Sequence, residues 1–247
     1  MHQEHLEGAR ESFRVSIRKT NMANDQEKEA AARASLRFIK NGDVVGLGTG
    51  STAAFMVKLL GEKVRAGLSV RGIPTSVKTK EHAEREGIPL TTLDEVQDIN
   101  VTIDGADEFD PQLNLTKGGG GALLREKIIA SASRKLVIVT DSSKQVPMLG
   151  KFPLPVEVIP FAEALVTKKI LALGATVKLR RGSDGNVFIT DERHHILDCM
   201  FGQIPDPPTL ARKLSDTPGI VEHGLFIGMA SVVLIAKSGG VEELQRK

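Results

Sequence analysis

VVGLGTGSTAAFMVKLL, residues 44–60, decides the fold class of this chain. The apolar run at 44–47 predicts a short buried strand, the glycine-rich turn GTGST follows it, and Phe55, Leu59 and Leu60 predict a helix. A strand that passes through a glycine turn into a helix is the building unit of a parallel α/β sheet. The stretch therefore predicts an open sheet covered by helices.

The same unit recurs on both sides of this stretch. The sequence predicts strands at 68–73, 88–90, 101–103 and 136–139, and helices at 25–39, 76–86 and from the glycine run at 118–121 to about Ser133. Short strands that alternate with longer helices pair in parallel and carry helices on both faces. We expect a Rossmann-like α/β domain.

The pattern changes at KFPLPVEVIP, residues 151–160, which contains three prolines. Beyond it we predict a strand (155–159), a helix (161–173), strands at 176–180 and 187–191, with 195–199 as a candidate partner, a helix (207–215) and a strand (220–227). This is the β-α-β-β-α-β order of a ferredoxin-like α+β unit. A buried strand at 230–236 and a short helix after Gly239 and Gly240 complete the chain.

The expected organisation is a Rossmann-like parallel sheet domain, residues 24–150 plus 228–247, with an inserted ferredoxin-like α+β domain over 151–227. Residues 1–23 lack the apolar core of a signal peptide, and Glu4, Glu7 and Glu11 argue against a transit peptide. We expect this segment to be a flexible extension, with Met22 as the natural start.

The composition disfavours several classes of function. The net charge is +2, and Trp and Tyr are absent, so the chain offers little for binding nucleic acid. No apolar run reaches the length of a membrane helix. Cys199 is the single cysteine, which rules out an intrachain disulfide and a thiolate metal cluster and fits a reducing cytoplasm.

Three loops should meet at the carboxyl edge of the sheet, where ligands of such folds gather. The first, GLGTGSTA at 46–53, predicts a phosphate site built from helix amides and hydroxyl groups. It also matches G-x-G-x-x-A, yet the next strand offers no acidic residue for a ribose, and the GK[ST] ending of a nucleotide-binding P-loop is missing. A plain tight turn is the remaining alternative.

The second loop, DGADEFD at 104–110, places Asp104 and Asp107 just past a buried strand. Neighbouring carboxylates raise each other's pKa and can then move protons. A solvated acidic loop is the plainer interpretation. A magnesium site is disfavoured because the ammonium of Lys117 would compete with the ion.

The third loop, KGGGG at 117–121, can wrap backbone amides around an anion, with Lys117 beside it. On the following helix, Glu126 has apolar neighbours three and four residues away, which should raise its pKa and make it a stronger base. Alternatively, Glu126 faces solvent between Arg125 and Lys127. Together, a phosphate site, an oxyanion site, a base and a second carboxylate suit an enediolate intermediate, which needs neither a redox cofactor nor a metal.

Several long motifs in order resemble ribose-5-phosphate isomerase, type A: GLGTGSTAAF, GIPTS, DGADE, KGGGGALLREKI, TDSSKQV and LGKFPLPVEVIP. The resemblance runs from about Asp25 to the end of the chain. It implies interconversion of ribose 5-phosphate and ribulose 5-phosphate in the pentose phosphate pathway, without a cofactor, by a homodimer or homotetramer that commonly assembles through the smaller domain.

The resemblance also implies the role of each site residue. Glu126 would move the proton between C1 and C2, while Asp104 and Asp107 would assist ring opening and proton exchange among hydroxyls. Lys117 would hold the oxyanion with the amides of the glycine run. The implied substrate contacts are Thr49, Gly50, Ser51, Thr52, Gly105, Ala106, Gly118, Gly119, Gly120 and Lys144, with Lys28 as a further candidate.

Some features depart from the resemblance. KGGGG has one glycine more than the KGGGA expected, and residues 1–23 have no counterpart. His194 and His195, with Asp198 and Cys199, could form a metal site, but neighbouring residues of a strand point to opposite faces, so an exposed strand is favoured.

Other functions fit the same architecture. A sugar-phosphate deaminase and a coenzyme A transferase are rival enzymes, and the transferase would use a glutamate as nucleophile. A non-catalytic sugar-phosphate sensor is disfavoured because Asp104, Asp107, Lys117 and Glu126 are all present.

Overall fold

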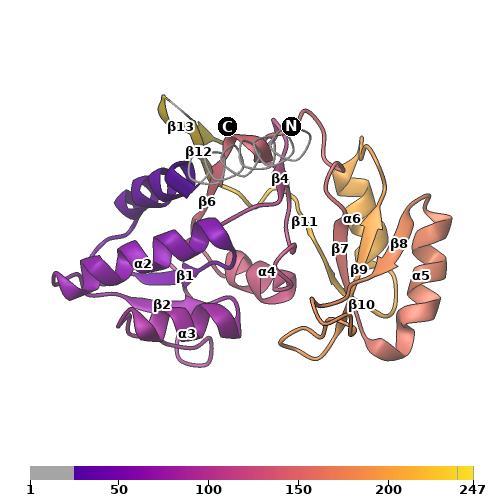
Figure 1. Ribbon diagram of the computed structural model, residues 1–247, viewed down its shortest axis with the longest axis horizontal. Coiled ribbons are helices and arrows are strands. Elements are labelled where there is room, and N and C mark those ends of the chain that lie inside the picture. The colour runs from indigo at the N-terminus through magenta and orange to yellow at the C-terminus, as the bar shows by residue number, and fades with distance from the viewer. Residues whose placement is uncertain (1–24, 238, 247) are drawn as a thin grey trace, which may run out of the picture.

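The computed structural model describes residues 25–237 and 239–246 (Figure 1). Two β-sheets carry the helices, and a small third sheet joins them. The expected flexible extension at 1–23 and the expected start at Met22 lie outside the described residues. None of the helices in the described ranges combines the length and the apolar character needed to cross a bilayer.

The larger sheet has the strand order β13-β12-β6-β3-β1-β2. Its strands are β1 (Val44–Leu47), β2 (Arg71–Pro74), β3 (Val101–Asp104), β6 (Leu136–Asp141), β12 (Val232–Lys237) and β13 (Gly240–Gln245). All neighbouring pairs are parallel except β12 with β13. The predicted parallel α/β sheet is therefore confirmed, with one antiparallel strand added at its edge.

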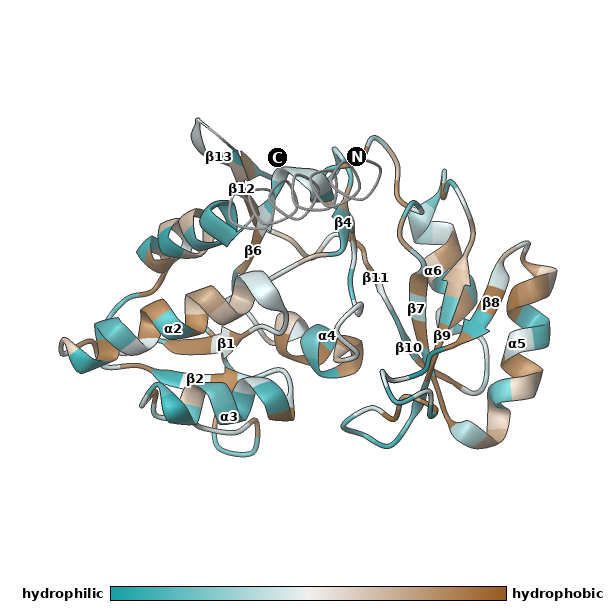
Figure 2. Ribbon diagram, viewed as in Figure 1, coloured by the Kyte–Doolittle hydropathy of each residue, from teal (hydrophilic) through white to brown (hydrophobic). Residues whose placement is uncertain are grey.

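Alternate residues of β6 show why helices cover both faces. Val137 and Val139 pack with the helix over 25–35, with α2 (Ser51–Arg65) and with α3 (Val77–Arg85). Leu136 and Ile138 pack toward α4 (Leu123–Ser131) and the small third sheet on the other face. In Figure 2 the brown colour of apolar residues is prominent along the strands of the larger sheet. A strand buried on both faces reads as a continuous apolar run, as the sequence of β6 does.

Two predictions in this domain were wrong. The residues after Gly239 form strand β13 and not a helix: Val241 packs into the core on one face of the sheet and Leu244 into the core on the other. Side chains that alternate between two faces require a strand. The strand predicted at 88–90 is reduced to a single bridge between Gly72 and Leu90.

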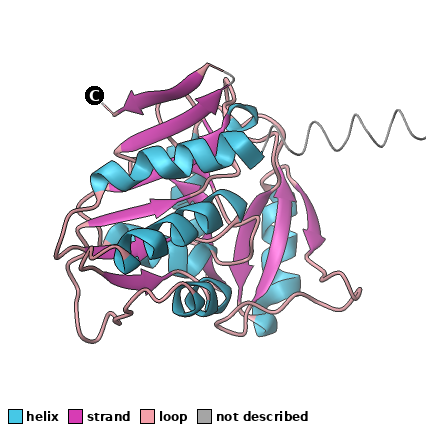
Figure 3. Cartoon of the chain, turned by 60° about the vertical axis from the view of Figure 1, so that its left-hand side comes forward, coloured by secondary structure: helices cyan, strands magenta, loops and turns pink. Residues whose placement is uncertain are grey.

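The second unit is a four-stranded antiparallel sheet in the order β10-β7-β9-β8, with its own apolar core. Figure 3 shows the helices and strands of the chain from a second side. Its elements are β7 (Leu154–Val158), α5 (Glu163–Ala172), β8 (Thr176–Leu179), β9 (His195–Met200), α6 (Pro207–Ser215) and β10 (Ile220–His223). The alternation of strands and helices follows the predicted order.

The strand predicted at 187–191 does not form, since these residues make one bridge, between Arg181 and Val187, and then cross toward the first domain. The candidate partner at 195–199 is the true strand, β9. The predicted strand over 220–227 is interrupted at Gly224, whose N–H donates to Pro155 O and whose O accepts from Lys117 N.

The third sheet consists of β4 (Glu108–Phe109), β5 (Leu115–Thr116) and β11 (Leu225–Phe226). Short 3₁₀ helices lie at Leu36–Phe38, Ser142–Lys144 and Pro160–Ala162. In Figure 1, β4 and β11 run between the two larger sheets. The hairpin of β4 and β5 has Asp107 just before it and Lys117 just after it, so both residues return to the end of β3.

Candidate active site

A cavity of about 230 Å³ opens at the carboxyl ends of β1, β3 and β6. It is lined by Lys28, Thr49, Gly50, Ser51, Thr52, Gly105, Ala106, Asp107, Lys117, Gly118, Gly119, Gly120, Glu126, Asp141, Ser143 and Lys144. Of the predicted site residues, only Asp104 is not in this lining, because it lies beneath Lys117. Asp141 and Ser143 were missed, although they belong to the TDSSK loop that supplies Lys144.

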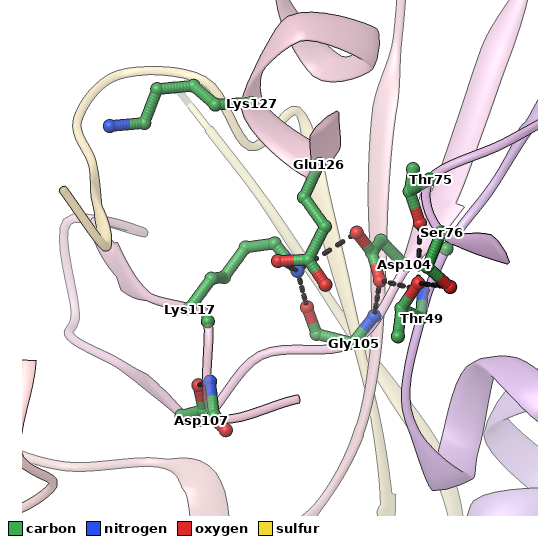
Figure 4. Close-up of polar contacts among 12 residues, drawn as sticks. Thr49, Thr75, Ser76, Asp104, Gly105, Asp107, Lys117, Glu126 and Lys127 are labelled. Atoms are coloured by element: carbon green, nitrogen blue, oxygen red, sulfur yellow. Dashed lines mark hydrogen bonds and ion pairs between the residues drawn. The ribbon is translucent and has the colours of Figure 1, made fainter. Parts of the chain in front are cut away.

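Lys117 organises the floor of the cavity (Figure 4). Its Nζ lies 2.9 Å from Asp104 Oδ2 and 3.3 Å from Glu126 Oε2, and it donates a hydrogen bond to Gly105 O at 2.6 Å. The side chains of Lys117, Asp104 and Glu126 are at most 3% exposed. Glu126 therefore faces the cavity, and the alternative in which it faces solvent is wrong. Lys127 extends away from this cluster in Figure 4.

Three separate elements bring these side chains together. Asp104 is the last residue of β3, Lys117 follows β5, and Glu126 lies in the first turn of α4. Asp104 Oδ1 accepts from Thr49 N at 3.0 Å and from Gly105 N at 2.7 Å, which ties the loop after β1 to the end of β3. A Cβ at Gly48 would lie 2.2 Å from the same oxygen, so this position requires glycine.

Burial and the neighbouring charges together set the proton affinities of the cluster. Burial raises the pKa of Glu126 to about 8; the Lys117 charge opposes this shift, and the Asp104 and Asp107 charges add to it. Burial likewise raises the pKa of Asp104 against the effect of Lys117. For Lys117 burial acts to lower the pKa, but the two carboxylates outweigh it and the net pKa is raised. One ammonium thus faces two carboxyls, and charge balance is best when one carboxyl holds a proton.

Two carboxylate oxygens keep free acceptor capacity. Asp104 Oδ2 and Glu126 Oε2 are buried within ion-pair distance of Lys117, and neither oxygen accepts a hydrogen bond of good geometry from the described part of the chain. A buried oxygen without a hydrogen bond is costly, and a ligand that donates to it removes that cost. Glu126 lines the cavity, so its Oε2 is suited to receive a proton from a bound hydroxyl or carbon acid, whereas Asp104 Oδ2 lies deeper, beneath Lys117.

The glycine run forms the opposite wall. Gly118 and Gly121 have positive φ angles of 103° and 83°, and Gly121 N donates to Gly118 O at 3.0 Å. Gly119 N donates to Asp107 Oδ2 at 2.7 Å. The amide of Gly119 is thus already engaged, whereas those of Gly118 and Gly120 donate to no acceptor in the described ranges.

Asp107 does not act as a direct partner of Asp104, which corrects the predicted carboxylate pair. The carboxyl that shares a cation with Asp104 is Glu126, and Asp107 serves the glycine wall. The spacing within DGADE could not indicate this, because both contacts depend on residues beyond position 115.

The loop after β1 supplies the other end of the cavity. Gly50, with φ 118°, precedes α2, so the first amides of that helix start at Ser51, beside Lys28 and Lys144 in the cavity lining. Helix amides and two ammonium groups make this end suited to an anion.

The Thr49 hydroxyl is held behind the loop by Thr75, Ser76 and Thr79, with oxygen separations of 2.8, 2.8 and 3.1 Å. This hydroxyl therefore positions the loop, and the three residues that hold it were missed although GIPTS contains two of them.

The candidate metal ligands do not converge. His194 Nδ1 lies 3.0 Å from Glu157 Oε1, whereas His195 Nδ1 lies 2.6 Å from Glu163 Oε2. Within the described residues, no three His, Cys, Asp or Glu side chains are grouped to hold a metal ion.

Comparison with known proteins identifies the family of this chain. The family model for ribose 5-phosphate isomerase A (phosphoriboisomerase A) matches residues 71–240. The chain belongs to the ribose 5-phosphate isomerase A family. The ribose-5-phosphate isomerase A of Rhodopseudomonas palustris (strain HaA2) is 54% identical over 228 residues, covering 90% of this chain and 98% of that protein. That of Bradyrhizobium diazoefficiens is 51% identical over 236 residues, covering 92% and 98%.

Solved structures of ribose 5-phosphate isomerases share this fold. A D-ribose-5-phosphate isomerase in complex with phospho-erythronic acid superposes with a TM-score of 0.88 at 40% identity, covering 90% of this chain and 99% of that one. Ribose 5-phosphate isomerase A of Methanocaldococcus jannaschii gives a TM-score of 0.86 at 40% identity, covering 89% and 98%. The match spans both units of the chain.

Proposed function

We propose that this chain interconverts D-ribose 5-phosphate and D-ribulose 5-phosphate, an aldose-ketose isomerisation of the non-oxidative pentose phosphate pathway. The observation that carries the proposal is the buried Glu126 carboxyl beside the Lys117 ammonium, on the floor of a cavity whose far end suits a phosphate. Membership of the family supports it.

Glu126 is the proposed base. Its carboxylate takes the proton from C2 of the open-chain aldose, the C–H electrons form the C1=C2 bond, and the carbonyl electrons move to O1. In the resulting enediolate the O2–H proton passes to O1, the Glu126 acid returns its proton to C1, and the O2 electrons form the C2=O2 bond of the ketose. A carboxyl with a pKa near 8 is matched to this exchange, since both of its protonation states are accessible near neutral pH.

Lys117 and the glycine wall are the proposed oxyanion stabilisers. The ammonium is fixed by Asp104, Glu126 and Gly105 O before the substrate arrives, so no reorganisation is needed when charge develops. Removing one such donor from an enzyme typically costs a factor of about 10² to 10³ in kcat. This pre-positioned charge supplies what a Lewis acid would otherwise provide.

Asp104 and Asp107 are the proposed groups for ring opening and for proton exchange among hydroxyls. Asp104 Oδ2 has free acceptor capacity beside Lys117, and Asp107 lines the cavity. The proposed phosphate contacts are the first amides of α2, Ser51 and Thr52, with Lys28 and Lys144 supplying charge.

We further propose that residues 151–227 are a ferredoxin-like insertion into a Rossmann-like domain of residues 24–150 and 228–247. The strand order β10-β7-β9-β8, with α5 and α6 between strands, supports it. A homodimer or homotetramer that assembles through this unit is supported by exposed apolar side chains there, with Phe161 98% and Leu165 54% exposed. The buried, unpaired Cys199 is compatible with a cytoplasmic location.

The activity is tested by incubating the purified protein with ribose 5-phosphate in EDTA and following the ketose, with arabinose 5-phosphate in parallel. Formation of ribulose 5-phosphate is expected. No ketose under these conditions contradicts the proposal. Hydroxylamine distinguishes the rival transferase, because a glutamyl adduct would form only if Glu126 acted as a nucleophile.

A further inference from the structure

Arg180, the residue after β8, reaches from the second unit to the glycine wall of the cavity. Its Nη1 donates to Gly118 O at 2.8 Å and to Gly119 O at 3.2 Å. The rest of the guanidinium is held by Asp198 on β9: Nε donates to Oδ2 at 3.0 Å, and Nη2 contacts Oδ1. The Arg180 side chain is 12% exposed. A largely buried, bidentate pair of this kind fixes the fork of the arginine in one orientation.

Because the peptide bond is planar, the contact between Arg180 and these carbonyls also fixes the direction of the neighbouring N–H groups. In a trans peptide the C=O of one residue and the N–H of the next point in opposite directions. Because both carbonyls point at Arg180, the amides of Gly119 and Gly120 point away from it. Gly119 N indeed reaches Asp107 on that side, and Gly120 lines the cavity with its amide unpaired within the described ranges.

Other contacts keep the segment around Arg180 in place. From here on, residues 180–192 are called the crossing segment. Its Phe188 ring occupies the space beside Gly121, 2.4 Å from the position of an added Cβ. Asp191 accepts from Val77 N at the start of α3 at 2.8 Å, and Arg125 of α4 forms an ion pair with Glu192 at 2.5 Å. The crossing segment is therefore attached to α3 and α4 of the larger-sheet domain.

We infer that Arg180 is a positioning residue: it holds the Gly119–Gly120 peptide plane so that the Gly120 N–H faces the reacting oxygen, and it holds the Gly118–Gly119 plane so that the Gly119 N–H stays on Asp107. The inference rests on the proposed function and adds a role for the second unit in catalysis. The guanidinium also draws electron density from the two carbonyls, which makes the paired amides better donors. Because the phosphate binds at the other end of the cavity, loss of Arg180 should lower kcat far more than it raises KM.

The test compares Arg180→Met and Arg180→Lys with Arg181→Met as the matched control. Arg181 is the next residue, but its guanidinium donates to Gly185 O within its own turn and does not contact the glycine wall. For each variant kcat, KM and thermal stability are measured with ribose 5-phosphate, together with the inhibition constant of phospho-erythronic acid. That acid is used because its carboxylate can present negative oxygens to the amides as the intermediate would.

Both Arg180 variants should lose at least tenfold in kcat, change KM less than threefold, and bind phospho-erythronic acid at least tenfold more weakly, while Arg181→Met matches the parent chain. In a third variant, Arg180→Ala, free guanidinium at millimolar concentration should partly restore kcat. Equal kcat in the parent and in Arg180→Lys overturns the inference, as does an equal loss in Arg181→Met. If Arg180→Met does not fold, Arg180→Lys decides. An inactive parent chain counts against the proposed function instead.

Discussion

Glu126 Oε2 lies 3.3 Å from Lys117 Nζ, although the two residues belong to different elements and neither side chain is more than 3% exposed. A carboxyl in this position is pulled in two directions. Burial favours the neutral acid, and the adjacent ammonium favours the carboxylate. Burial prevails and the pKa rises to about 8, which produces a base that holds a proton in the resting enzyme and is strong once that proton is lost.

The pH dependence of the rate follows from this pKa. The base must be deprotonated to act, so kcat/KM should rise about tenfold per pH unit below the pKa of Glu126 and level off above it. Initial rates with ribose 5-phosphate from pH 6 to 9.5 check this. A profile that is flat between pH 6 and 8 is incompatible with a raised pKa in the free enzyme.

Folding stability should carry the opposite pH dependence. The pKa of Glu126 is raised from 4.5 in the unfolded chain to about 8, so between these values the folded state binds more protons than the unfolded state. The free energy of unfolding must therefore fall as pH rises through this window. Glu126→Gln lacks this proton, so its stability should fall less steeply between pH 5.5 and 8.5. Urea unfolding of both chains measures the two slopes, and equal slopes contradict the assignment.

Adjacent glycines of the cavity wall should respond differently to the same substitution. A Cβ at Gly119 would lie 2.5 Å from Asp107 Oδ1, whereas a Cβ at Gly120 would come no closer than 3.5 Å to Thr49 Cγ2. Gly119→Ala should displace the Asp107 carboxylate and lower kcat/KM about tenfold or more, whereas Gly120→Ala should stay within a few-fold of the parent. Steady-state kinetics of the two variants measure this difference. A larger loss of kcat/KM in Gly120→Ala than in Gly119→Ala would show that the Gly119 amide does not position Asp107.

Gly121 and Phe188 should be coupled across the two units. Gly121 has a φ of 83°, and an added Cβ would meet the Phe188 ring at 2.4 Å. Gly121→Ala should therefore lower the free energy of unfolding by about 2 kcal/mol, from backbone strain and from the clash. Adding Phe188→Leu should recover the part due to the clash. Denaturant unfolding of the single and double variants gives the coupling free energy between the two positions. If the two effects simply add, the Phe188 ring does not contact position 121.

Local pattern predicted most of the architecture because most of the parallel strands are short apolar runs that alternate with helices. Local pattern gave wrong predictions where contacts with residues distant in the sequence determine the structure. Val241 and Leu244 form a strand because β12 offers an open edge, and residues 187–191 leave the sheet because Asp191 and Glu192 find partners on α3 and α4.

The candidate site was predicted to a similar extent: its main residues were identified, but not the contacts that hold them. The motifs placed Lys117 and Glu126 on one loop and one helix, and the structure brings both to the cavity. Spacing could not show that Asp107 serves Gly119, that Arg180 supports the same wall, or that Thr75 holds Thr49. Each of these contacts joins residues from different elements, so each depends on the tertiary fold.

The central claim is that Glu126 removes the C2 proton of the substrate, and exchange with solvent measures this most directly. Ribose 5-phosphate is incubated in D₂O with the parent chain or with Glu126→Gln, and deuterium at C2 is followed by proton NMR. Glu84→Gln, an exposed glutamate on α3, is the control. The parent and the control should exchange the C2 proton, and Glu126→Gln should do so at least 10²-fold more slowly while still binding the sugar phosphate. Exchange by Glu126→Gln within tenfold of the parent rate would contradict the account.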